Sequence, residues 1–125
     1  MKEGRPYYEL DVWKKARLLV SEVYDLTKSF PEHEKFALTS QIRRALVSVP
    51  SNIAEGIGRQ HKKEQIQFMY ISRGSLYELE TQLFLALDQR YISEEQLSSA
   101  LERITDCKRL GQGFINYLKS KSKAD

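Results

Sequence analysis

The sequence predicts an all-α protein: an antiparallel up-down-up-down four-helix bundle that forms one domain over residues 1–125. Three observations favour this fold. Apolar residues recur at three- and four-residue steps in four long segments, as they do on one face of an α-helix. Only three prolines and six glycines occur in the whole chain. The connections between the segments are short, and short connections make successive helices antiparallel neighbours. We expect flexible ends at about residues 1–6 and 120–125.

The first helix is expected over residues 11–29. Its apolar face contains Val12, Ala16, Leu19 and Val23, which are three or four residues apart. Pro31 follows this segment, and the residue before a proline disfavours helical geometry. The helix therefore ends before Pro31.

The second helix is expected over residues 36–57 and contains Pro50. A proline has no N–H to donate, so the carbonyl of Leu46 loses its usual partner and the helix bends or breaks. One kinked helix and two short helices that meet at Val49 both fit this pattern. Because the apolar period continues in phase across Pro50, we expect a single helix that is kinked at Pro50.

The third helix, expected over residues 62–89, is more apolar than a half-buried helix requires. Positions 83–87 are Leu-Phe-Leu-Ala-Leu, which places apolar side chains all round the helix. A helix in a four-helix monomer buries only one stripe, so the excess apolar surface indicates contact with another subunit. The candidate residues of this oligomer interface are Leu83, Phe84, Leu85 and Leu87.

The fourth helix is expected to begin at Ser93, because Ser93-Glu94-Glu95-Gln96 matches a capping box. In that motif the first and fourth side chains each accept a hydrogen bond from the backbone N–H of the other residue. The apolar stripe then continues through Cys107 to Leu118. The position of Cys107 in this stripe indicates a buried, unreactive thiol rather than a nucleophile.

The residue types exclude several classes of function. With one cysteine no intramolecular disulfide forms, so we expect a reducing compartment, the cytoplasm. The first residues contain no apolar signal segment, and no apolar run is long enough to span a bilayer, so we expect no membrane partner. His33 and His61 have no cysteine or carboxylate at metal-ligand spacing, and no nucleophile has a base nearby in the sequence. We predict no metal, no cofactor and no catalytic residue, and hence no enzyme.

Charge is segregated along the chain, although the net charge is only +3. Residues 35–73 contain seven basic and two acidic residues, whereas residues 74–106 contain two basic and seven acidic residues. Ordinary solvated helix faces explain this pattern, and so does a basic surface that contacts phosphates. The glycine turn at residues 56–58 either simply ends a helix or, with the helix that follows, holds a phosphate. The candidate nucleic-acid contacts are Arg43, Arg44, Arg59, Lys62, Lys63, Lys108 and Arg109.

Arg73 lies within the apolar third helix, among Tyr70, Leu76 and Tyr77. A buried arginine needs a paired acceptor, which indicates a structural role for Arg73 in preference to catalysis. The expected structural polar network between the second and third helices consists of Asn52, Glu55, Arg73 and Glu80.

Two passages of the sequence resemble a known family. Residues 41–56 are Gln-Ile-Arg-Arg-Ala-Leu-Val-Ser-Val-Pro-Ser-Asn-Ile-Ala-Glu-Gly, and residues 73–83 are Arg-Gly-Ser-Leu-Tyr-Glu-Leu-Glu-Thr-Gln-Leu. The segment Leu-Asp-Val-Trp-Lys-Lys-Ala at residues 10–16 agrees as well. Over about residues 7–119 the chain resembles the bacterial four-helix bundle proteins named for intervening sequences in 23S ribosomal RNA genes, also called S23 ribosomal proteins. It is also similar to the accessory protein of diversity-generating retroelements.

The resemblance implies an antiparallel bundle that assembles into a ring, typically a homopentamer. The retroelement accessory protein is a basic pentamer that binds a reverse transcriptase and nucleic acid. No catalytic residues follow from the resemblance. We therefore expect a non-enzymatic oligomeric accessory protein that binds RNA or other nucleic acid through basic surface residues. The alternative is a protein-interaction scaffold, a ring-shaped homo-oligomer with no role in nucleic-acid binding.

Overall fold

The structure is a computed structural model, which describes residues 5–124. Within these residues the chain forms four α-helices and two short 3₁₀ helices, and no strand. The predicted all-α four-helix bundle is therefore confirmed. The α-helices are α1 (Asp11–Thr27), α2 (Leu38–Ile57), α3 (Lys62–Asp88) and α4 (Glu94–Ala124), and the 3₁₀ helices are η1 (Tyr7–Glu9) and η2 (Glu32–Glu34).

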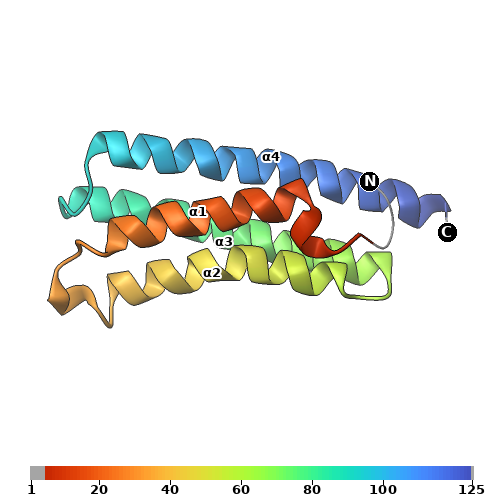
Figure 1. Cartoon of the computed structure of the whole chain (residues 1–125), viewed down its shortest axis with the longest axis horizontal. Helices are drawn as coiled ribbons and strands as arrows, with labels where there is room; N and C mark the ends of the chain where they lie inside the picture. The colour runs from red at the N-terminus through yellow and green to blue at the C-terminus, as the bar shows by residue number, and fades with distance from the viewer. Residues whose placement is uncertain (1–4, 125) are drawn as a thin grey trace.

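The α-helices lie along one long axis, and the chain turns back at each connection between them (Figure 1). α1 packs against α2 and α4, and α3 packs against the same two helices. One core runs between them: Leu19, Ile42, Leu79 and Ile104, one from each helix, are all 0% exposed. Burying one such side chain stabilises the fold by about 1.5–3 kcal/mol. This core fixes which face of each helix points outwards.

α2 continues through Pro50 as one helix, so the alternative of two short helices is wrong. The kink of this helix at Pro50 stays a prediction. Side chains supply hydrogen bonds to carbonyls beside the proline. The amide of Asn52 donates to the carbonyl of Ser48 at 2.8 Å, and the hydroxyl of Ser72 on α3 donates to the carbonyl of Val49 at 2.9 Å. Such bonds compensate for the disturbed helix pattern around a proline.

Small residues let α2 and α3 pack closely. The hydroxyls of Ser48 and Ser75 are 2.8 Å apart, so a hydrogen bond crosses directly between the two helices. Near the end of α2, a Cβ atom added at Gly56 would lie 2.7 Å from the Cβ of Phe68. Close backbone approach of this kind requires a residue without a Cβ. Gly56 is therefore a packing residue in the last turn of α2, and Gly58 is the C-cap that ends this helix.

The predicted capping box at the start of α4 is confirmed. The backbone N–H of Ser93 donates to the side-chain oxygen of Gln96 at 2.9 Å, and the backbone N–H of Gln96 donates to the Ser93 hydroxyl at 3.1 Å. α4 then continues to Ala124, past the point where a flexible end was expected. Residues 1–4 and 125 of the expected flexible ends lie outside the described residues.

The predicted bounds of α1 and α2 need correction. α1 ends at Thr27 rather than at residue 29, and α2 begins at Leu38 rather than at residue 36. The connection is longer because Pro31 leads into η2, a 3₁₀ turn that the apolar pattern does not reveal. Element ends are the least sharply defined part of any helix.

One predicted interface residue is wrong. Leu83 is 0% exposed and belongs to the core of the bundle, so it has no surface to offer to another subunit. Leu87 is partly buried against the same core. Only Phe84 and Leu85 face outwards, with 48% and 47% of their surface exposed. The helical period explains the difference, because a residue adjacent to a core position points about 100° away from it.

Candidate nucleic-acid interface

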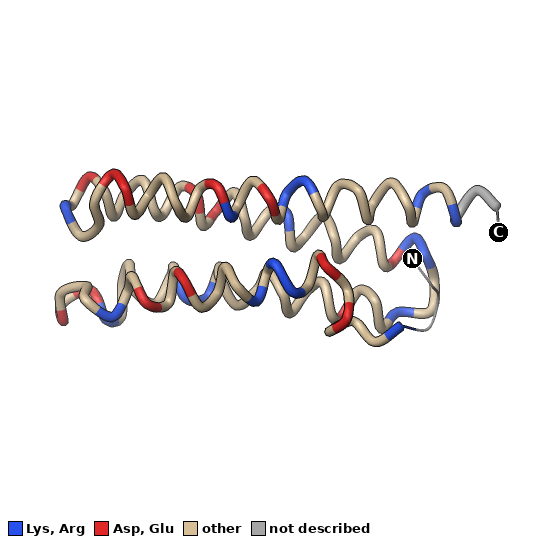
Figure 2. Tube along the Cα trace, turned by 45° about the horizontal axis from the view of Figure 1, so that its top comes forward, with Lys and Arg blue, Asp and Glu red and all other residues tan. Residues whose placement is uncertain are grey.

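Cations from the α2–α3 connection, α3 and α4 gather at one end of the bundle. Along α4, most acidic segments lie in the first half and the basic segments lie toward the C-terminus (Figure 2). The connection from α2 to α3 lies at this same end (Figure 1) and carries further basic residues. We call this surface the basic end; it consists of Arg59, Lys62, Lys63, Lys119 and Lys121.

Arg59 is held in place at the basic end. Its guanidinium lies 3.0 Å from the carboxylate of Glu55 and 4.7 Å from the centre of the Phe68 ring. The pair joins the last turn of α2 to the residue that follows its C-cap, four positions later. Lys63 is exposed on the first turn of α3, beside Lys62. The α2–α3 turn therefore presents three predicted contacts together, as the sequence indicated.

Tyr70 joins α3 to the C-terminal part of α4. The ammonium of Lys119 hydrogen-bonds its hydroxyl and lies 5.6 Å from its ring centre, and the guanidinium of Arg73 lies 4.8 Å from the same centre. The hydrogen bond from Lys119, with the two nearby positive charges, lowers the pKa of Tyr70. Tyr70 is seven residues from Lys63, which corresponds to about 10 Å along a helix. Tyr70 and Lys119 thus extend the basic end across α3 and α4.

Sequence reasoning missed Lys119, Lys121 and the aromatic residues beside them. The ammonium of Lys121 lies 5.7 Å from the centre of the Tyr117 ring. A signal was present in the sequence, because Tyr117 precedes these lysines by two and four residues. The interleaving of basic and aromatic residues is typical of surfaces that bind single-stranded nucleic acid.

Lys108 and Arg109 lie elsewhere and already have acidic partners. The ammonium of Lys108 is 2.7 Å from the carboxylate of Glu80 on α3 and 3.9 Å from the centre of the Tyr77 ring. Arg109 lies 3.4 Å from the carboxylate of Asp106. The side chains of Lys108 and Glu80 are both about three-quarters buried, so this pair holds α3 to α4. Because its ammonium is already paired inside the bundle, Lys108 is not a phosphate contact.

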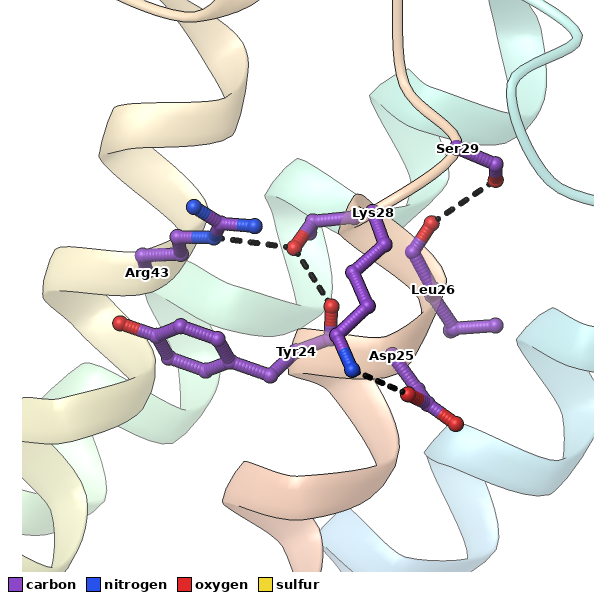
Figure 3. Close-up of polar contacts among 7 residues, drawn as sticks. Tyr24, Asp25, Leu26, Lys28, Ser29 and Arg43 are labelled. Atoms are coloured by element: carbon purple, nitrogen blue, oxygen red, sulfur yellow. Dashed lines mark hydrogen bonds and ion pairs between the residues drawn. The ribbon is translucent and has the colours of Figure 1, made fainter.

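Arg43 and Arg44 form a separate surface in the first half of α2. Arg43 is 16 residues from Arg59, which corresponds to about 24 Å along a helix. Its side chain reaches the end of α1 (Figure 3), where its Nε donates to the hydroxyl of Thr27 at 3.0 Å. Arg44 is exposed on the outer side of α2. The seven predicted contacts therefore divide among three places on the bundle.

The predicted polar network is wrong as a single cluster. The guanidinium of Arg73 donates to the side-chain oxygen of Gln112 on α4 at 2.7 Å, instead of to a carboxylate of the predicted network. The hydrogen bonds between α2 and α3 come instead from Ser48, Ser72 and Ser75, which were not part of the predicted network. The partners are Ser48 for Asn52, Arg59 for Glu55, Gln112 for Arg73 and Lys108 for Glu80.

Cys107, the one cysteine of the sequence, lies inside the bundle. Cys107 is buried, and burial together with the charge of Asp106 raises the pKa of its thiol to about 11. A thiol with so high a pKa is a poor nucleophile at neutral pH. Among residues 5–124, no three His, Cys, Asp or Glu side chains are grouped as metal ligands. Within the same range, every helix is too short or too polar to cross a membrane.

The fold and the basic end define a helical-bundle protein with a basic, aromatic surface at one end. The family model of the 23S rRNA-intervening sequence protein matches residues 8–113. The chain therefore belongs to the 23S rRNA-intervening sequence protein family. Similarity to the accessory protein of diversity-generating retroelements stays a prediction.

A solved structure agrees with this membership. The chain is similar to the crystal structure of a protein with unknown function from the S23 ribosomal protein family of Bacteroides thetaiotaomicron. The identity is 27%, the TM-score is 0.77, and the match covers 83% of this chain and 97% of the other. No curated protein matches the chain.

Proposed function

We propose that the protein is a non-enzymatic accessory protein that binds RNA, or another single-stranded nucleic acid, at its basic end. The observation that supports this most is the placement of cations from the α2–α3 connection and from α4 over aromatic rings of α3 and α4. Arg59 lies over Phe68, Lys119 over Tyr70 and Lys121 over Tyr117. Cations of this surface neutralise phosphates, while the partly exposed rings beside them offer stacking contacts to bases when a cation moves to a phosphate. Its location in the cytoplasm stays a prediction.

The proposal predicts a strong dependence of binding on salt. Neutralising about five phosphates of a single strand gives a slope near −3.5 in a plot of log affinity against log salt. Affinity for a fluorescein-labelled oligouridylate then falls by about 100-fold between about 50 and 200 mM salt. The combined change Lys63→Glu and Lys119→Glu is expected to weaken binding at low salt by about tenfold or more and to reduce the slope by about 2. Fluorescence anisotropy measures both quantities.

Lys28→Glu provides the matched control. Lys28 is an exposed lysine at the end of α1, at the opposite end of the bundle from the α2–α3 connection (Figure 1). The same reversal of charge there is expected to leave the affinity within about twofold. Binding that ignores salt, or that falls equally in the control variant, would contradict nucleic-acid binding at the basic end.

Exposed apolar residues on α3 support a second candidate function, a scaffold that forms a ring-shaped homo-oligomer. Ile71, Tyr77, Phe84 and Leu85 all lie on α3 and are 44–54% exposed. A run of partly exposed apolar residues along one helix is a common feature of subunit interfaces. We propose self-association through Phe84 and Leu85, and the resemblance of the sequence implies five subunits.

Phe84→Glu tests this assembly. A charge placed in an apolar subunit contact is expected to dissociate the oligomer to monomers, because the carboxylate loses its hydration without gaining a partner. Size-exclusion chromatography with light scattering measures the mass. Leu18→Glu is the control, since Leu18 is 50% exposed on α1 and lies outside the α3 surface. A wild-type monomer, or an oligomer that is unchanged by Phe84→Glu, would rule out this interface.

A further inference from the structure

A groove runs along the outer side of α2, beside α1, and is separate from the basic end. It has a volume of about 750 Å³. One helical face of α2 forms its floor, with Ser40, Arg44, Val47 and Ser51 at steps of three and four residues, and Phe36 lies in the turn that leads into this helix. We call it the α2 groove. Its remaining lining residues are Tyr24, Lys35, Thr39, Arg43, Ser48 and Asn52.

The charge of the α2 groove has one sign. Lys35, Arg43 and Arg44 line it, and its lining contains no aspartate or glutamate. Lys35 lies 3.9 Å from the carboxylate of Glu32, a loose contact in which both side chains are mostly exposed. Exposed pairs of this kind contribute little energy, so Lys35 exchanges partners easily. The groove therefore attracts anionic groups and repels basic ones.

Arg43 is fixed in an orientation that suits an anion. Its Nε donates to the hydroxyl of Thr27 at 3.0 Å, its guanidinium lies 4.7 Å from the centre of the Tyr24 ring, and Thr27 in turn donates to the carbonyl of Tyr24 at 2.8 Å (Figure 3). Among residues 5–124, no hydrogen bond engages its two terminal nitrogens. An arginine held in this way binds a carboxylate with little further loss of conformational freedom.

Apolar side chains lie near both ends of the cationic stretch. Phe36 is 90% exposed and Val47 is 42% exposed. A phenylalanine almost entirely in water is unusual for a folded protein unless another surface covers it. Phe36 lies two residues before α2 begins, and Val47 lies nine residues after its first residue, about 14 Å along the helix. The α2 groove thus combines two apolar anchor points with cations between them.

We propose that the α2 groove binds an acidic amphipathic helix of a partner protein. Such a helix places its carboxylates against Lys35, Arg43 and Arg44 and its apolar residues against Phe36 and Val47. Charge complementarity sets orientation and speeds association, while the apolar contacts supply most of the affinity. Nucleic acid fits less well, because a base stacks on the ring of Phe36 but the aliphatic Val47 at the other end gives no ring for a second base.

Selection from a library of random peptides displayed on phage tests the proposal. The wild-type protein is the target, and variant Arg44→Glu is used to remove peptides that bind elsewhere. We expect the selected peptides to be rich in Asp and Glu with aliphatic or aromatic residues at helical spacing. A synthetic copy of one selected peptide is then titrated by fluorescence anisotropy. Arg44→Glu and Phe36→Ser are each expected to weaken its binding by about tenfold.

Matched variants keep this experiment specific. Lys63→Glu reverses an exposed charge at the basic end, and Leu18→Ser removes an exposed apolar side chain on α1; both are expected to leave peptide affinity within about twofold. Since Phe36 and Arg44 are exposed, their variants are expected to fold normally. Normal folding is checked by circular dichroism.

Three results would overturn the proposal. The first is a selection without enrichment of acidic peptides. The second is loss of oligouridylate binding, rather than peptide binding, in Arg44→Glu, which would assign the groove to nucleic acid. The third is dissociation of a wild-type oligomer by Phe36→Ser, which would make the groove a contact between copies of this chain.

Discussion

Leu83→Glu is expected to unfold the protein, although the neighbouring change Phe84→Glu leaves the bundle folded. Leu83 is 0% exposed, whereas Phe84 is 48% exposed. Leu83→Glu removes a buried aliphatic side chain and places a carboxylate in the core, and among residues 5–124 no lysine or arginine is buried there to pair with it. Burial of such an unpaired group, with the loss of packing, costs about 5 kcal/mol or more. This is comparable to the whole stability of a small domain.

Urea denaturation followed by circular dichroism measures this difference. If Leu83→Glu does not accumulate as folded protein, Leu83→Ala provides the quantitative value. We expect Leu83→Ala to lower the free energy of unfolding by about 2–5 kcal/mol. Phe84→Glu is expected to change it by about 0.5 kcal/mol in the monomer. Similar stability of the Leu83 variants and the wild type would show that Leu83 is not a core residue.

Gly56→Val is expected to separate α2 from α3 and to destabilise the bundle by about 2–3 kcal/mol. A Cβ at position 56 would lie 2.7 Å from the Cβ of Phe68 and 3.2 Å from the backbone carbonyl oxygen of Gln65. The first contact is with an atom fixed to the backbone of α3, so side-chain rotation does not relieve it. The α2–α3 contact also carries the Ser48–Ser75 hydrogen bond, which the same displacement disturbs.

Gly74→Ala is the matched control for this prediction. Gly74 lies in the middle of α3, and an added Cβ meets nothing within 4 Å. Replacing an exposed helical glycine with alanine stabilises by about 0.5–1 kcal/mol, because alanine loses less backbone freedom on folding. The two substitutions are thus expected to have opposite signs in thermal denaturation. A stabilised Gly56→Val protein would show that α2 and α3 do not approach as closely as described.

Much of the candidate site could be predicted from the sequence, because its residues are close together along the chain. Arg59, Lys62 and Lys63 lie within one turn of chain, so their proximity follows from sequence distance alone. Lys119 joins the same surface only through its contact with Tyr70, which lies 49 positions earlier. Arg43 points toward α1, where its partners Thr27 and Tyr24 lie. No pattern of charges along the chain specifies such pairings.

The sequence by itself determined the helices, the apolar stripe of each and the capping box at Ser93. These features depend on residues three or four positions apart, and the helical period alone brings such residues together. The tertiary structure decided which apolar residues of α3 are core and which are surface, so Leu83 is buried and Phe84 is not. It also decided that Arg73 contacts Gln112 on α4 instead of the carboxylates of α2 and α3. The physical reason is that a helix has several outward directions, and only the placement of its neighbours determines which of them become buried.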